Sequence, residues 1–142
     1  MADTRAPEAD DVVIQDVRVQ LFGPHDSGLA NDLADQVNQD FPGSSVKVPP
    51  PQPDSIAFIP VIVGAIAVFG LVHVMKNVWD DHQPATVVDF SEEPKKVYRD
   101  HEGKWNRGQV VVIGADGTVK VEQPDRESFT DVVAALIKAM AA

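Results

Sequence analysis

Two short clusters of acidic and histidine side chains carry the residue types that bind divalent metals: Asp80-Asp81-His82 and Asp100-His101-Glu102. Carboxylate oxygens and imidazole nitrogens are common ligands for such ions. Neighbouring residues on a helix point in different directions, however, so one ion would not easily collect three of them. The first cluster is therefore interpreted as a solvated helix end, with a metal site shared by both clusters as the alternative. We expect neither a metal nor another cofactor.

The remaining candidates for chemistry are single residues. The sequence contains no GxSxG, HExxH or P-loop pattern, and it has no cysteine for a thiolate nucleophile, disulfide or metal site. His25 is interpreted as a solvated turn residue. His73 is interpreted as an interfacial residue, and a proton-sensitive or hydrogen-bonding group between helices is the alternative. Trp105, with Lys104 and Arg107 nearby, is predicted to pack over a hairpin, and a small recognition loop is the alternative. We therefore predict a protein that is not an enzyme.

The composition limits the classes of partner. The chain has 22 acidic and 12 basic residues, a formal charge of -10, and an acidic chain repels phosphate backbones. We therefore expect no nucleic-acid partner, and any membrane contact must be hydrophobic. Hydrophobic residues make up 44% of the chain, enough for a folded domain. Residues 1–11 are acidic and lack an apolar segment, so they predict a flexible tail rather than a signal peptide.

The order of periodic segments predicts an α+β fold that begins with a strand-helix-strand unit at 12–48. Apolar residues alternate with polar ones from Val17 to Leu21, as in a half-buried strand, and recur at helical spacing from Leu29 to Val37. A second strand ends this unit. The proline-rich residues 49–54 then predict a stiff, extended spacer.

Residues 85–142 are predicted as a β-rich part that ends in a helix. Four of its segments are rich in strand-forming residues: 85–90, 95–99, 109–114 and 118–123. Asp116-Gly117 lies between the last two and predicts an antiparallel hairpin, since both central positions of such a turn favour positive φ. From Phe129 to Met140, apolar residues recur at the spacing of an amphipathic terminal helix.

The longest apolar segment carries most of the functional interpretation. Residues 55–75 hold no formal charge, and a helix is predicted over 55–80. The segment exceeds the roughly 20 residues needed to cross a bilayer, and it shows no polar stripe. Lys76 and Trp79 at its C-terminal border are residue types that settle at a membrane interface. The residues expected to face lipid or another subunit are Ile56, Phe58, Ile59, Ile62, Gly64, Ile66, Phe69, Gly70, Leu71 and Val74.

Two interpretations of this helix stay open. In the first, the helix crosses a membrane once, without a cleaved signal peptide, and separates residues 12–48 from residues 85–142. In the second, strands of both parts join in one sheet, and a second subunit must cover the helix, because so small a fold cannot enclose it. Both interpretations predict a non-enzymatic adaptor or interaction protein with protein partners, and in both we expect a homo-oligomer. We prefer the interpretation of a membrane-anchored or assembly-forming protein. The alternative is a soluble, cytoplasmic self-assembling protein whose subunit interface is formed by this helix.

The order of the segments resembles a known family. The chain begins with a strand, Gly23-Pro24, an acidic helix and a second strand. After these come the proline-rich residues 48–54, an apolar helix that ends at Val78-Trp79, and an Asp-Gly hairpin before a last helix. This order is similar to that of the effector-associated constant component proteins of bacterial conflict systems. The resemblance covers about residues 17–140, and the chain departs from the family in its more apolar helix and in an apparent insertion at 91–107. It implies a compact α+β accessory protein, encoded beside changeable effectors, with no catalytic residues.

Overall fold

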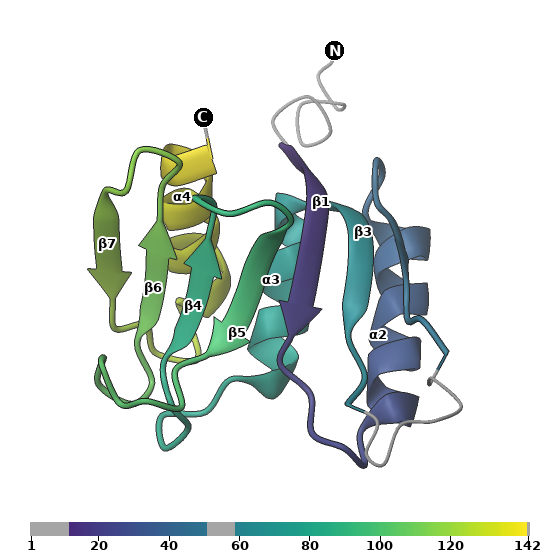
Figure 1. Ribbon diagram of the computed structural model, residues 1–142, viewed down its shortest axis with the longest axis horizontal. Coiled ribbons are helices and arrows are strands. Elements are labelled where there is room, and N and C mark those ends of the chain that lie inside the picture. The colour runs from purple at the N-terminus through teal and green to yellow at the C-terminus, as the bar shows by residue number, and fades with distance from the viewer. Residues whose placement is uncertain (1–11, 51–58, 142) are drawn as a thin grey trace.

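The computed structural model describes residues 12–50 and 59–141. Three predicted features lie outside these ranges: the tail at 1–11, most of the proline-rich spacer, and Ile56 and Phe58, which were predicted to face lipid or another subunit. Within the described residues, a seven-stranded mixed sheet packs against three helices (Figure 1). The predicted α+β class is confirmed.

Strands from both sides of the apolar segment share one sheet, whose order is β2-β3-β1-β5-β4-β6-β7. The β1–β5 and β4–β6 pairs are parallel, and the other neighbours are antiparallel. Along the described chain the elements are β1 (Val13–Gln20), α2 (Ser27–Asp40), β2 (Ser45–Lys47), β3 (Ile62–Ala67), α3 (Val68–Val78), β4 (Thr86–Asp89), β5 (Lys95–Arg99), β6 (Val110–Ile113), β7 (Val119–Glu122) and α4 (Phe129–Ala141).

One face of the sheet forms the core with the helices. Residues directly opposite on neighbouring strands share a face. A buried row on five neighbouring strands consists of Ile62, Val19, Val97, Val88 and Val112. Figure 1 shows α2, α3 and α4 behind the sheet and no described helix in front of it. The described residues therefore form two layers, with helices on one sheet face only.

A bulge in β1 keeps its apolar residues on the helix side. The pairing of β1 with β3 shifts between Ile14 and Val17, and Asp16 has a φ of 57°. The extra residue lets both Ile14 and Val17 enter the core, although they are three positions apart. The predicted alternation from Val17 through Val19 to Leu21 is confirmed, since all three are buried.

The predicted helix over 55–80 is wrong in its first half. Residues 62–67 form strand β3, and helix α3 begins only at Val68 and ends at Val78. The strand passes directly into the helix, so no polar turn interrupts the apolar sequence. Buried strands and buried helices are both apolar throughout, and the run of residues without charge combines one of each. In the described part of the chain, no helix is both long enough and apolar enough to cross a membrane.

Helix α3 is enclosed by its own chain. It contacts β3, α2 and α4, and Leu71, Val72 and Val74 have no exposed surface. Gly70 permits a close approach of α2, because a Cβ at this position would lie 3.2 Å from Cγ1 of Val37. Only a narrow strip of the helix is partly or fully exposed: Phe69, His73, Lys76, Asn77 and Val78. The sheet and two helices thus supply the apolar surroundings that the sequence assigned to lipid or to another subunit.

The predicted terminal helix is confirmed as α4. Phe129, Leu136 and Ile137 face the core and are buried. Oδ1 of Asp125 accepts hydrogen bonds from N and Oγ of Ser128, at 2.8 and 2.7 Å. These bonds fix the turn that leads into the helix, and they lower the pKa of Asp125.

The predicted hairpin is confirmed as β6 and β7, with one difference in its turn. Gly114 N donates to Thr118 O at 2.8 Å, and Gly117 N donates to Gly114 O at 2.9 Å. Gly117 has a φ of 88°, whereas Asp116 is not among the residues with positive φ. Asp116 instead accepts a hydrogen bond at Oδ1 from Thr118 N, at 3.0 Å. Only one of the two central residues therefore needs the left-handed conformation.

We expect Gly117→Val to lower the free energy of unfolding by about 1 kcal/mol or more, because a β-branched residue resists positive φ. No other atom lies within 4 Å of the place a Cβ would take, so the loss comes from the backbone alone. Gly117→Asn is the control and should cost less, since asparagine tolerates this conformation. Urea unfolding compares the two, and a valine variant as stable as the wild type would contradict the turn described here.

Candidate functional site

The sheet face opposite the helices carries two rows of aligned side chains, which we call the open face. The first row crosses all seven described strands: Lys47, Val63, Arg18, Lys96, Asp89, Ile113 and Val119. The second row crosses five strands: Gln20, Tyr98, Val87, Val111 and Val121. Both rows are polar or charged near β1 and β5 and aliphatic near β6 and β7.

The loop between β5 and β6 covers part of the open face. Trp105 packs against a small cluster formed by Ala85, Val87 and Val111. Its backbone N donates to Oδ2 of Asp100 at 2.7 Å, which holds the loop in place. The predicted packing of Trp105 over a hairpin is confirmed, because Val111 belongs to the hairpin strand β6.

A hollow of about 490 Å³ lies on the open face over β1, β4 and β5. Its lining is mixed in character: Gln20, Phe22, Ile59, Asp89, Glu92, Lys96, Tyr98, Arg99 and His101. Ile59, predicted to face lipid or a subunit, is 55% exposed here. Lys96 Nζ lies 3.4 Å from Oε1 of Glu92, so part of the charge in the hollow is already paired.

Tyr98 lines the hollow, and its phenol has a shifted pKa. Burial raises its pKa, and the negative charges of Asp89, Asp100, Glu92 and Glu102 raise it further. The phenol therefore stays protonated at neutral pH and acts as a hydrogen-bond donor. Together with the carboxylate of Asp89, this arrangement suits the binding of polar groups.

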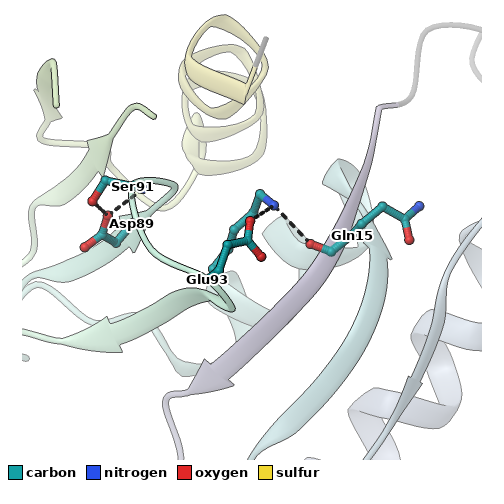
Figure 2. A network of polar contacts seen from close by, with 5 residues as sticks. Gln15, Asp89, Ser91 and Glu93 are labelled. Carbon is teal, nitrogen blue, oxygen red and sulfur yellow. Dashed lines mark hydrogen bonds and ion pairs between the residues drawn. The ribbon is translucent and has the colours of Figure 1, made fainter. Parts of the chain in front are cut away.

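Polar contacts hold the turn between β4 and β5 beside the hollow (Figure 2). Oδ1 of Asp89 accepts hydrogen bonds from N and Oγ of Ser91, at 2.8 and 2.6 Å. Lys95 Nζ lies 3.1 Å from Oε2 of Glu93 and donates to the backbone O of Gln15 at 3.4 Å. The hydrogen bond with Lys95 lowers the pKa of Glu93. These contacts connect the turn to the bulge of β1.

The edge of the sheet at β2 is closed by a side chain. Asn38 of α2 donates from Nδ2 to Val46 O and accepts at Oδ1 from Val46 N, both at 2.9 Å. The amide thus occupies the outward N–H and C=O groups that a further strand would use. Proteins commonly block edge strands in such ways, because free edges recruit other strands.

The opposite edge, at β7, has no comparable cover among the described residues. All four of its residues are exposed. The turn bond from Gly114 N to Thr118 O fixes the alternation of the ladder, so Lys120 and Glu122 pair with β6. The backbone N–H and C=O groups of Val119 and Val121 therefore point away from the sheet. The β7 edge can accept another strand.

Sequence reasoning predicted β7 as a strand but did not identify it as an edge. Its signal was the pattern Val119-Lys120-Val121-Glu122, aliphatic on one face and charged on the other. Charged residues at alternate positions are typical of edge strands. The closing contact at β2 joins residues of two different elements and has no local signal.

Hydrogen bonds involve His73 and part of each acidic cluster. In the described residues, no group of three or more potential ligands could hold a metal ion. Oδ1 of Asp80 accepts a hydrogen bond from His82 N at 2.7 Å, and His82 O accepts one from Arg107 Nη1 at 2.6 Å. His73 Nε2 lies 2.8 Å from Oε1 of Gln36 in α2, so His73 makes the contact between helices that was the alternative to the expected interfacial position.

Five of the described residues predicted to face lipid or a subunit belong to the core of this chain or pack against it. Four of them have no exposed surface: Ile62, Ile66, Leu71 and Val74. Phe69 is partly buried, with Lys138 Nζ 4.3 Å from its ring centroid. Trp79, predicted to lie at a membrane interface, is only 6% exposed, and its Nε1 donates to Gly108 O at 2.8 Å. Lys76, also predicted to lie at a membrane interface, is half-buried near the end of α3.

Comparison of the chain with protein-family models, with curated proteins and with solved structures gives no match. The functional interpretation therefore depends on the geometry of the open face and of the two sheet edges.

Proposed function

We propose that this chain is a non-enzymatic interaction protein that assembles with copies of itself by adding a strand at the β7 edge. The observation that carries the proposal is the difference between the two edges. Asn38 closes the β2 edge, whereas the outward backbone groups of β7 have no cover in the described residues. Strand addition at a free edge is a recurrent mode of protein recognition, because main-chain hydrogen bonds supply affinity and alternate side chains supply specificity.

The proposed interface differs from the one expected from the sequence. The apolar residues of α3 pack against β3, α2 and α4 of the same chain, so we move the subunit contact from this helix to β7. The expectation of a protein partner and a homo-oligomer is kept. The accessory role in a bacterial conflict system, implied by the resemblance, stays a prediction.

Val121→Pro is expected to abolish self-association while leaving the fold intact. The N–H of Val121 points away from β6, so a proline removes a donor only from the free edge and blocks the approach of another strand. Sedimentation equilibrium should show a mass that rises with concentration for the wild type and a monomer for the variant, at similar thermal stability. Val121→Thr keeps the N–H and the β-branched shape and should associate like the wild type. A wild-type protein that stays monomeric up to millimolar concentration would contradict the proposal.

A further inference from the structure

We infer that the assembly is a two-fold symmetric dimer in which β7 pairs antiparallel with β7 of a second copy, with the axis at Val121. The inference rests on the proposed function and adds the register of the interface. A two-fold interface uses the same surface on both copies, so the strand must be complementary to itself. Whether Val119-Lys120-Val121-Glu122 meets this condition can be tested for each possible axis.

The hydrogen-bond pattern first restricts the position of the axis. The outward N–H and C=O groups of Val119 and Val121 must face outward groups of the second copy, because the groups of Lys120 and Glu122 are used by β6. Residues that face each other in a symmetric antiparallel pair lie at equal distances from the axis. The axis must therefore pass through a residue and not between two residues.

The charges of the side chains then select one residue. An axis at Lys120 or at Glu122 places that residue opposite its own copy, and like charges directly opposite destabilise a sheet. An axis at Val119 places Glu122 opposite Asp116 of the turn, which is again a pair of like charges. An axis at Val121 places Lys120 of each copy opposite Glu122 of the other. Two opposite-charge pairs then form on one face, and the two Val121 side chains meet on the other.

The surroundings of β7 leave room for a second copy. Helix α4 contacts both β6 and β7, yet Lys120 and Glu122 on the helix side are exposed. Within the described residues, neither of the two takes part in an ion pair, so both charges are available to a partner. Val119 and Val121 are 44% and 37% exposed on the open face. Pairing would make one continuous sheet from two and bring the aliphatic ends of both open faces together.

Charge reversal tests the register directly. Lys120→Glu should raise the dissociation constant of the dimer by about tenfold, because both cross-strand pairs become repulsive. Glu122→Lys should weaken the dimer similarly. An equimolar mixture of the two variants should associate like the wild type, since each altered position then faces the opposite charge. The double variant K120E/E122K should also recover. Lys47→Glu makes the same charge change on the closed edge strand β2 and serves as the control, with no expected effect.

Sedimentation velocity up to millimolar concentration measures the association, and circular dichroism shows that each variant is folded. Recovery in the mixture and in the double variant, with no effect of Lys47→Glu, supports the axis at Val121. A wild type that dimerises and is blocked by Val121→Pro, but is unaffected by the single charge reversals, would overturn the register and leave the proposed edge intact. Single variants that stay weakened in the mixture would also overturn the register. A monomeric wild type would overturn the register and the proposed function together.

Discussion

Gly64→Ala should lower the free energy of unfolding by about 3 kcal/mol or more, because it combines backbone strain with a steric clash. Gly64 lies in the middle of β3 with a φ of 135°, a conformation that residues with a Cβ rarely adopt. An added Cβ would lie 2.2 Å from the backbone O of Ser45 and 3.0 Å from Cα of Val46. Backbone atoms of a paired strand cannot rotate away as a side chain does. We therefore expect β2 to separate from β3 in this variant, or the protein to unfold.

Gly28→Ala is the matched control for this prediction. Gly28 lies in the first turn of α2, has no positive φ, and has no atom within 4 Å of the place of its Cβ. Alanine there should leave stability unchanged or raise it by up to about 1 kcal/mol, since alanine favours helices more than glycine does. Urea unfolding measures both variants. If Gly64→Ala differs from the wild type by only a few tenths of a kcal/mol, the close contact between β2 and β3 is wrong.

Elements such as β1 and α4 were predictable because each is amphipathic. In β1 and α4 one side meets the core and the other meets water, so the spacing of apolar residues reveals the period. The bulge at Asp16 could not be predicted in this way, because it shifts which residues of β1 face the core without changing the composition of the strand.

The apolar segment was not predictable in the same way, because both of its elements are largely buried. Strand β3 lies between β2 and β1, and α3 lies between α2 and α4. Strand β3 has no charged residue and α3 has only a narrow polar strip, so neither element shows its period clearly, and no turn residue marks the passage at Ala67. Two weaker signals were present in the sequence. Pro60-Val61-Ile62-Val63 is typical of a strand, and His73, Lys76 and Asn77 are spaced at i, i+3 and i+4 of a helix that begins later.

The candidate site was harder to predict than the fold, because a strand becomes an edge through contacts far along the chain. β1 pairs with β3 and β5, and β4 lies between β5 and β6, so the strand order does not follow the sequence. This order puts β2 and β7 at the two edges. Asn38 can close the β2 edge because α2 crosses beside Val46. The charged residues of β7 give a weak sequence signal for an edge, whereas the contact between Asn38 and Val46 has none.

Ile66→Arg should prevent stable folding, whereas Ala65→Arg should change stability by less than about 0.5 kcal/mol. Ile66 has no exposed surface and faces the helices from β3. An arginine there would bury an unpaired charge at a cost of about 3–5 kcal/mol, which is comparable with the whole stability of many domains. Ala65 is the next residue along the strand and is partly exposed on the open face, opposite Ser45 of β2. A long side chain at this position can extend into water.

The contrast between these two neighbours separates a strand from a membrane-spanning helix. Both residues lie near the middle of the apolar segment, where a spanning helix would make either arginine costly. In a strand, side chains of successive residues point to opposite faces, so only one of the two substitutions can reach the core. Far-ultraviolet circular dichroism and thermal unfolding of both variants measure the difference. If both substitutions lower the stability by a similar amount, residues 62–67 do not form strand β3. If only Ile66→Arg lowers it, successive side chains in this segment alternate between a covered and an uncovered face.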